Sequence, residues 1–379
     1  MFKLLTPALF AGGGPRLPRD GRIDLLRGCA LLTIFIDHVP DNPLTAVTLR
    51  NFGFSDAAEL FVILAGISAM LAYGKCFERE GTAAGVRRVF GRCARLYIYQ
   101  IGLLVGTLVI AQVWRAQFGL EPVNLAPFFD MPLAAMAHAL MLHALPASLN
   151  ILPLYVVVLG AFPLLYAGMR AAPRLTLGAS ALLWLAANLE PRFNLPNWLD
   201  GSGWYFNPFA WQFLFALGML AAAVLRANGG HLPRHRALTV AACAYLVVAL
   251  LLAAPWTVWG ISHAQLLAFD APDKTALAPA RLLDILAMMY LALSSGLLRR
   301  AADSAWARPL VACGRHSLEV FAFLTLLALV FKLLFHTYGD SLGMDVAVNV
   351  VGLGSILALG TWMERGQGAS AHGHALAAG

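Results

Sequence analysis

His38 is the side chain in this sequence best suited to catalysis. Its imidazole titrates near neutral pH, and an acidic residue, Asp37, directly precedes it. Such an imidazole can take a proton from a hydroxyl group and act as a general base. Two more carboxylates, Asp56 and Glu59, open the next apolar segment, and either could orient the imidazole. His336, near the end of a later apolar segment, is the rival base.

A second group of residues is suited to binding phosphate, because the planar arginine fork matches phosphate oxygens. Arg27 lies eleven residues before His38. On a helix this is about three turns, or roughly 16 Å, so both residues lie on nearly the same face. The remaining candidates lie near the starts of two later segments and are Arg88, Arg92, Arg95 and Arg315. For Arg88, the charge of an ordinary cytoplasmic loop is the alternative explanation.

The elements that carry these residues are apolar enough to cross a membrane. The chain of 379 residues is 60% hydrophobic and 12% charged, whereas soluble domains are about 45–50% apolar and about 25% charged. We therefore predict an all-α polytopic membrane protein embedded in a lipid bilayer, with about ten transmembrane helices. Their predicted ranges are 23–39, 57–74, 93–113, 149–169, 174–189, 207–226, 237–254, 281–299, 317–336 and 343–363.

Lysine and arginine are concentrated in alternate loops, and this bias predicts that both termini are cytoplasmic. A net charge of +7 follows from this topology, so we expect no nucleic acid partner. The five cysteines are odd in number and have no zinc-ligand spacing, which argues against a disulfide framework or a metal site. The polar residues within the segments then fall at two depths, with His38 on the outer side and Arg27 on the inner side.

The outer side also carries candidates for substrate binding. They lie at the start of the sixth segment, at the start of the eighth and near the end of the ninth, and are Asn207, Trp211, Gln212, Arg281, Lys332 and His336. Aromatic residues occupy the outer loops as well, among them Trp256 and Trp259. They are either a membrane-interface belt or a platform on which sugar rings stack.

Several longer motifs give the sequence a family resemblance. Arg27, ten intervening residues and His38 form a pattern typical of the acyltransferase-3 membrane enzymes. The chain resembles the OpgC family, which succinylates periplasmic glucans, over about residues 20 to 363. The similar segments are RIDLLRG (22–28), IDH (36–38), NFGFSDAAELFV (51–62), NILPLY (150–155), FNPFAWQ (206–212) and GRHSLEVF (314–321).

This resemblance implies an O-acyltransferase of the bacterial inner membrane. It implies that acyl-CoA, and for this family succinyl-CoA, is a co-substrate used from the cytoplasm, with no permanently bound cofactor. The acceptor would be a periplasmic glucan. By the same resemblance His38 is the catalytic candidate, and the basic start of the third helix faces the CoA. Lys332 or Arg281 could hold the second carboxylate of a succinyl group.

We predict one domain, an OpgC-like acyltransferase over 20–365, with a cytoplasmic segment at 1–19 and a disordered cytoplasmic tail at 366–379. Two other functions stay open. One is acyl transfer to another envelope glycan or to a lipid. The other is secondary transport, which buried charges and Gly- or Pro-broken helices would suit, although no inverted repeat is visible and the arginines favour one side.

Overall fold

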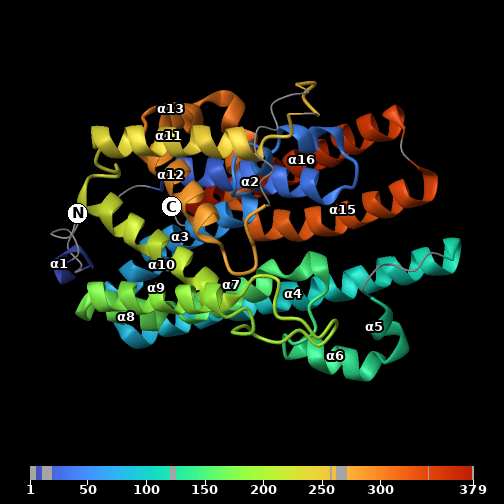
Figure 1. The fold of residues 1–379 in the computed structure, drawn as a ribbon, viewed down its shortest axis with the longest axis horizontal. Coiled ribbons are helices and arrows are strands. Elements are labelled where there is room, and N and C mark those ends of the chain that lie inside the picture. The colour runs from blue at the N-terminus through green and yellow to red at the C-terminus, as the bar shows by residue number, and fades with distance from the viewer. Residues whose placement is uncertain are drawn as a thin grey trace. The chain divides into compact units, whose positions relative to one another are not determined.

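The computed structural model describes residues 6–10, 19–119, 125–256, 258–261, 271–339 and 341–377 (Figure 1). Within these ranges the chain is helical and contains no strand, in agreement with the predicted all-α class; one isolated antiparallel bridge joins Pro196 and Gly203. Most of the predicted segment 1–19 lies outside these ranges. The last helix, α16, covers Leu342–Ala377, and the predicted disorder of the tail from residue 366 stays a prediction.

The helices group into two compact units. Unit 1 contains Met1–Leu17, Phe61–Leu246 and Phe269–Tyr290, and unit 2 contains Pro18–Leu60, Val247–Ala268 and Leu291–Gly379. The helices wholly in unit 1 are α1 (Pro7–Phe10), α4 (Thr82–Phe118), α5 (Ala126–Asp130), α6 (Pro132–Leu140), α7 (Ile151–Gly160), α8 (Phe162–Ala171), α9 (Pro173–Leu189) and α10 (Pro208–Ala227).

Those wholly in unit 2 are α2 (Gly21–His38), α13 (Leu297–Asp303), α14 (Arg308–Arg315), α15 (Ser317–Tyr338) and α16, with short 3-10 turns at Pro43–Val47, Leu49–Asn51 and Ala305–Ala307. Three helices pass from one unit to the other along the chain: α3 (Ala57–Arg79), α11 (Arg236–Ala253) and α12 (Pro279–Ser294).

Each of the ten predicted segments coincides with a helix or with a bent helix pair. In the described part of the chain six helices are long and apolar enough to cross a membrane: α3, α4, α10, α11, α15 and the first 25 residues of α16. The number rises to eight if two bent pairs each count as one span. The chain is therefore a membrane protein by the length and composition of its helices.

The two bends have local causes. Residues Ala147–Gly160 and Phe162–Ala171 meet at 40°, and Pro163 near the break has no N–H for the helical ladder. The bend of 71° between Pro279–Ser294 and Leu297–Asp303 falls at the Ser295-Gly296 pair.

The two other predicted spans, α2 and α9, are not among the helices that are long and apolar enough to cross a membrane. Helix α9 has only 17 residues, and α2 has 18 residues but carries Arg22, Asp24, Arg27 and Asp37. Charged groups are costly in lipid and need protein partners. The partners that α2 has are described below.

Helix α4 differs from the prediction in length. It has 37 residues, which at 1.5 Å per residue is about 55 Å. The hydrocarbon core of a bilayer is only about 30 Å thick, so a large part of α4 must extend beyond it. The segment predicted to span begins at residue 93, and the surplus at the N-terminal end carries the arginines.

Two glycines bring α3 and α10 into backbone contact within unit 1. A Cβ added at Gly66 would lie 2.1 Å from the carbonyl oxygen of Phe215, and one at Gly218 would lie 2.3 Å from that of Ile63. Small residues of this kind are typical of helix contacts in membranes. Beside this pair, α9 packs on both α8 and α10, and α4 packs on α7.

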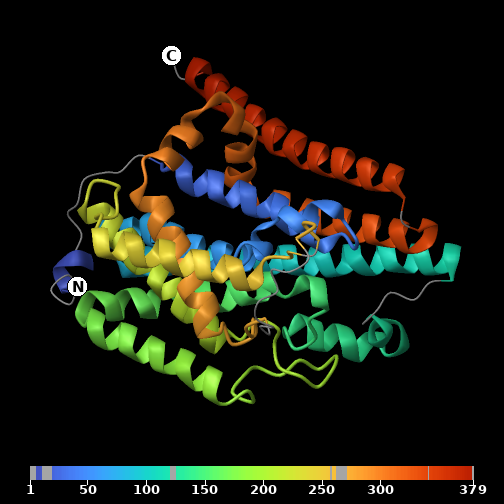
Figure 2. The same cartoon turned by 45° about the horizontal axis from the view of Figure 1, so that its top comes forward.

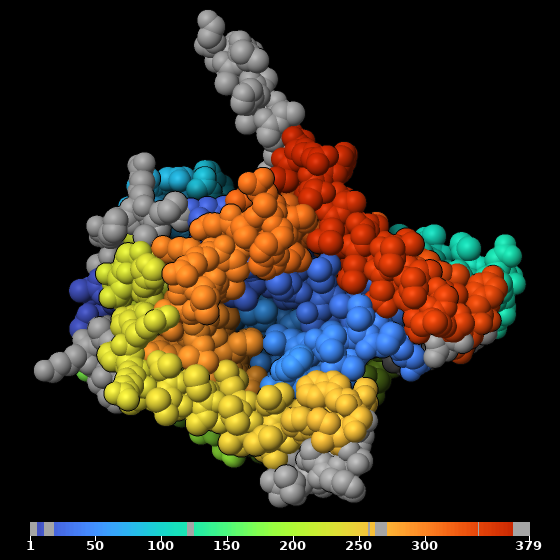
Figure 3. Space-filling model, turned by 90° about the horizontal axis from the view of Figure 1, so that it is seen from above, coloured from blue at the N-terminus to red at the C-terminus, as the bar shows by residue number. Residues whose placement is uncertain are grey.

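In unit 2, α2 packs against α14, α15 and α16. The contact with α14 is again made by glycines, since a Cβ at Gly28 would lie 2.0 Å from the carbonyl oxygen of Leu310 and one at Gly314 would lie 1.8 Å from that of Asp24. Figures 2 and 3 show α16 running back from its turn with α15 towards α13 and α14. Helix α2 is thus surrounded by the C-terminal helices of its own unit.

We expect Gly218→Ala to lower the stability of the protein by about 1–3 kcal/mol, because the new methyl group overlaps the backbone of α3. Gly178→Ala is the matched control, since nothing lies within 4 Å of a Cβ there and alanine favours a helix over glycine by about 1 kcal/mol. Thermal unfolding in detergent would measure both. Equal stability of the two variants would contradict the close packing of α3 on α10.

Candidate functional site

Helix α2 carries candidate residues at both of its ends. It begins after Asp20, whose carboxylate caps the helix by accepting a hydrogen bond of 3.1 Å from the Arg22 N–H. It ends at His38. The polar residues at its two ends therefore lie in two separate places in unit 2, as the two depths predicted for this helix require.

The imidazole of His38 is exposed and is held by the backbone of its own helix. Its Nδ1 lies 2.7 Å from the carbonyl oxygen of Ile34, one turn earlier. A carbonyl oxygen can only accept, so Nδ1 carries the hydrogen of this bond. The neutral ring then has Nε2 as its basic nitrogen. This is the tautomer that a general base acting through Nε2 needs.

Asp37 ties the end of α2 to the loop that follows. The Thr48 hydroxyl lies 2.7 Å from Asp37 Oδ1 and 2.8 Å from the carbonyl oxygen of Thr45, and Thr48 is buried. Earlier in the loop, the side-chain amides of Asn42 and Asn349 of α16 exchange two hydrogen bonds of 3.0 Å. The segment directly after His38 is therefore fixed to α2 and α16.

Asp56 and Glu59 form a capping box at the start of α3. Asp56 Oδ1 accepts from the Ala58 N–H at 2.8 Å, and Glu59 Oε2 accepts from the Asp56 N–H at 2.9 Å. Glu59 is fully buried. The D-x-x-E spacing before an apolar run was visible in the sequence, and it explains why both carboxylates stand here. That one of them orients His38 stays a prediction.

Lys332 and His336 lie one helical turn apart on α15, and both are exposed. Phe331, next to Lys332, packs on Phe35 of α2 with ring centroids 6.0 Å apart. Because Phe35 is three residues before His38, this contact places Lys332 and His336 towards the His38 end of unit 2.

The predicted substrate residues of α10 are engaged within unit 1. Asn207 caps α10 through the Phe209 N–H at 3.0 Å and donates to the carbonyl oxygen of Phe193 at 2.7 Å. Trp211 is buried and donates to the carbonyl oxygens of Lys274 and Thr275 at 3.2 and 3.1 Å.

Gln212 exchanges hydrogen bonds with Ser180 of α9, at 2.6 Å to the hydroxyl and 2.8 Å to the carbonyl oxygen. Through these hydrogen bonds the side chains of Asn207, Trp211 and Gln212 stabilise the packing of unit 1. Arg281 lies in the same unit, near the start of α12, and is buried together with Asp284.

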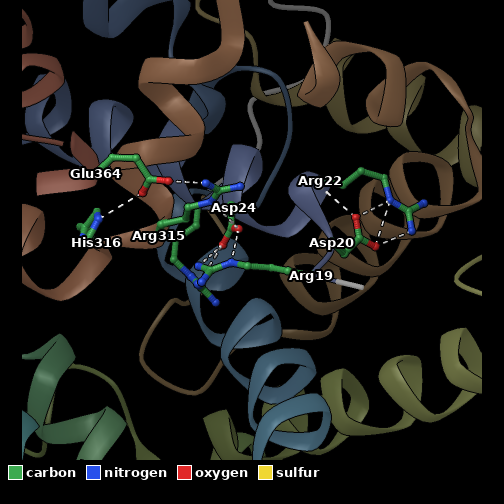
Figure 4. Close-up of polar contacts among 8 residues, drawn as sticks. Arg19, Asp20, Arg22, Asp24, Arg315, His316 and Glu364 are labelled. Carbon is green, nitrogen blue, oxygen red and sulfur yellow. Dashed lines mark hydrogen bonds and ion pairs between the residues drawn. The ribbon is translucent and has the colours of Figure 1, made fainter. Parts of the chain in front are cut away.

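At the other end of α2, the carboxylate of Asp24 is surrounded by guanidinium groups (Figure 4). Arg19 donates to it twice, at 2.7 and 3.0 Å, and this hydrogen bonding raises the pKa of the Arg19 guanidinium. Arg315 Nε lies 3.6 Å from Asp24 and Arg27 Nη1 lies 3.9 Å from it. Asp24 is only 4% exposed, so these cations replace the water that its charge would otherwise need.

Glu364 of α16 extends this cluster. It accepts from the Arg315 guanidinium and lies 3.3 Å from Nε2 of His316. Arg22, which is 1% exposed, pairs separately with Asp20 at 2.6 Å and donates to the carbonyl oxygen of Leu293 at 3.1 Å. We call Arg19, Asp24, Arg27, Arg315 and Glu364 the α2 ion cluster. Its three cations face two carboxylates, so it keeps one net positive charge.

The arginines of α4 lie in a different environment. Arg88, Arg92 and Arg95 follow the spacing of one helix face. Arg88 and Arg95 are exposed and Arg92 is half-buried. Arg88 pairs at 3.2 Å with Glu80, which is itself 49% exposed, and Arg95 lies over the ring of Tyr99 at 5.9 Å. The carboxylate that pairs with Arg88 is thus exposed, whereas Asp24 in the α2 ion cluster is almost fully buried.

Sequence reasoning missed Asp24, Arg19 and Glu364. A signal for Asp24 existed, because it lies three residues before Arg27 on the same helix, where opposite charges attract. Glu364 lies near the far end of another helix, and nothing in its neighbourhood indicates that its partner is Arg315.

A comparison with protein families finds that the model described as OpgC protein matches residues 19–367. No curated protein matches the chain. The family match spans both units and includes α2, α4 and the α2 ion cluster.

We expect Asp24→Asn to destabilise the protein by about 3 kcal/mol, because the variant leaves three guanidinium groups facing one carboxylate. Glu80→Gln is the control, since it removes the exposed pair with Arg88 and should cost under about 1 kcal/mol. Chemical unfolding in detergent would compare them. The cluster would have no stabilising role if both variants matched the wild type.

Proposed function

The chain belongs to the OpgC family, and from this premise we propose that it transfers an acyl group, succinyl in this family, from cytoplasmic acyl-CoA to hydroxyl groups of periplasmic glucans. Membership points to a role in modifying osmoregulated periplasmic glucans and to an acyltransferase activity. The single observation that best supports the chemistry is the Nδ1 hydrogen bond of His38, which leaves Nε2 as the base. A bacterial inner-membrane location follows from the same proposal.

In the proposed reaction His38 Nε2 removes the proton of a glucan hydroxyl as the oxygen attacks the thioester carbon. The tetrahedral intermediate collapses, the C–S bond breaks and the new C–O ester bond remains. The imidazolium returns its proton to the departing CoA thiolate, so His38 ends neutral. Base assistance of this kind contributes about 10²–10⁴-fold to a rate.

The donor phosphates would bind the α4 face of Arg88, Arg92 and Arg95. Two observations favour this face over the α2 ion cluster. Arg27 and Arg315 pair with Asp24 and Glu364, and Asp24 is almost fully buried, whereas Glu80, the partner of Arg88, is exposed. Arg88 and Arg92 also lie on the part of α4 before residue 93, which is surplus to the predicted membrane crossing, and Arg95 lies in the first turn of that crossing. In this proposal Arg27 and Arg315 position α2, and the α4 arginines bind the donor.

The succinyl group has a second carboxylate that requires a cation. Lys332 suits this role, because it is exposed on α15 one turn from His336 and at the His38 end of unit 2. Arg281 is the candidate of unit 1, where it is buried beside Asp284. An acetyl group has no second carboxylate and would need neither of these cations.

The two bent helix pairs are the one observation that also suits a secondary transporter, since broken spans line substrate sites in such proteins. A transporter would move its substrate unchanged. Mass spectrometry of periplasmic glucans from a deletion strain separates the possibilities. If the protein acylates glucans, the glucans of the deletion strain lack the ester groups, whereas deletion of a transporter would leave those esters in place. Esters missing from another glycan or from a lipid would identify a different acceptor.

We expect His38→Ala and His38→Gln to lower acyl transfer by at least about 10²-fold, since both remove the base. Transfer would be followed as ester formation on glucans supplied to membrane vesicles. The variants should insert in the membrane in normal amounts, because His38 is exposed. His336→Gln removes the rival base and is the matched comparison. Normal acylation with His38→Ala would falsify the assigned role.

We expect Arg92→Gln and Arg95→Gln each to raise the KM for acyl-CoA by about tenfold or more, with a smaller effect on kcat. A hydrogen bond to a charged group contributes about 1.5–3 kcal/mol, and about 1.4 kcal/mol is tenfold. Arg87→Gln is the matched control. Arg87 is exposed on the same helix but lies about 100° away from this face. Equal KM values for all three variants would remove the α4 face from the proposal.

A further inference from the structure

Three aromatic rings gather on unit 2 beside the loop that follows His38. The ring centroids of Phe52 and Trp259 lie 5.6 Å apart, and those of Trp256 and Trp259 lie 5.5 Å apart. We call Phe52, Trp256 and Trp259 the aromatic platform. Figure 3 shows the two chain segments, 247–261 in gold and 42–52 in light blue, next to each other on one face.

The platform is tied to the catalytic end of α2 by a chain of hydrogen bonds. Trp259 Nε1 donates to the carbonyl oxygen of Ala46 at 2.9 Å. Two residues on, Thr48 bonds to Asp37, the neighbour of His38. The Trp259 ring is therefore linked through the loop residues Ala46 and Thr48 to the end of α2.

The platform is open to solvent and has a polar edge. Phe52 is 44% exposed, and Trp256 and Trp259 are half-buried. Arg50, two residues before Phe52, and Asp41, just before the loop, are exposed as well. Flat apolar rings beside donors and acceptors suit a sugar, which has apolar C–H faces and a rim of hydroxyl groups.

A membrane-interface belt would explain exposed tryptophans equally well from sequence, but two observations here do not suit it. Interfacial tryptophans place their polar edge at the headgroups, whereas the Nε1 of Trp259 is used by the protein backbone. Exposed charged residues of both signs, Asp41 and Arg50, also lie in the chain segment that contains Phe52.

We propose that the aromatic platform binds a glucose ring of the acceptor glucan and so delivers a nearby hydroxyl to His38. This proposal rests on the proposed function and names its acceptor subsite. The platform supplies apolar contact through its three rings, and the exposed side chains of Arg50 and Asp41, in the same loop as Phe52, supply groups that can hydrogen-bond hydroxyls. The subsite is distinct from the side chains of α10, whose polar atoms are used within unit 1.

The test uses purified full-length protein in detergent and, as probe, unsubstituted glucans from a strain that lacks this protein. We expect Trp259→Ala and Phe52→Ala each to raise the KM for glucan by about tenfold, with the KM for acyl-CoA unchanged. Trp259→Phe keeps a ring but loses the N–H, and it should stay within about threefold of the wild type. Trp306→Ala is the control, because Trp306 is 67% exposed elsewhere in unit 2 and should leave both KM values unchanged.

Glucan binding measured by tryptophan fluorescence separates failure of the subsite from failure of the function. Binding by wild type and by His38→Ala, lost in Phe52→Ala, supports the platform even if no acyl transfer is detected. Transfer with an unchanged glucan KM in Trp259→Ala and Phe52→Ala overturns the platform but not the function.

Discussion

The backbones of α2 and α14 touch at Gly28 and Gly314, and the ion pair between Arg315 and Asp24 depends on this contact. A side chain at either glycine would overlap a carbonyl group of the opposite helix. Because Gly314 lies against Asp24, the next residue, Arg315, comes within reach of the Asp24 carboxylate. A carboxylate with so little exposure is stable only with such partners. Helix packing and charge pairing at this end of α2 are therefore coupled, because the close contact at the glycines brings the charged side chains within ion-pair distance.

The other end of α2 is also fixed by packing and hydrogen bonds. Phe35, one turn before His38, is fully buried against Phe331 and the backbone at Gly352. Asp37 holds Thr48, and Ile34 orients the imidazole. A base held in one orientation spends little of its time in unproductive geometry, which is the advantage of preorganisation. Helix α2 carries more charges than a membrane span of ordinary composition, and in the proposed function it is the rigid support of the catalytic base.

Much of this architecture could be predicted from the sequence, since long apolar runs have few structural solutions. All ten predicted segments are helices, although only six to eight satisfy the length and composition of a span. Partner choice could not be predicted. The amide of Gln212 looks like a ligand for a sugar, yet it binds Ser180 of a helix distant in sequence. The pair formed by Arg315 and Glu364, 49 residues apart, depends in the same way on how α14 and α16 pack.

The arginines illustrate why composition alone is a poor guide to a phosphate site. In sequence Arg27, Arg315, Arg92 and Arg95 are alike, since each lies at an inner end of an apolar segment. In the structure Arg27 and Arg315 lie beside buried carboxylates, so a phosphate that recruited them would have to compete with Asp24 and Glu364 and would disturb the packing of α2 on α14. Arg92 and Arg95 lie on another helix, α4, so an anion that contacts them does not compete for Asp24 or Glu364. In the proposed function, donor recognition is therefore assigned to α4 and the support of His38 to α2.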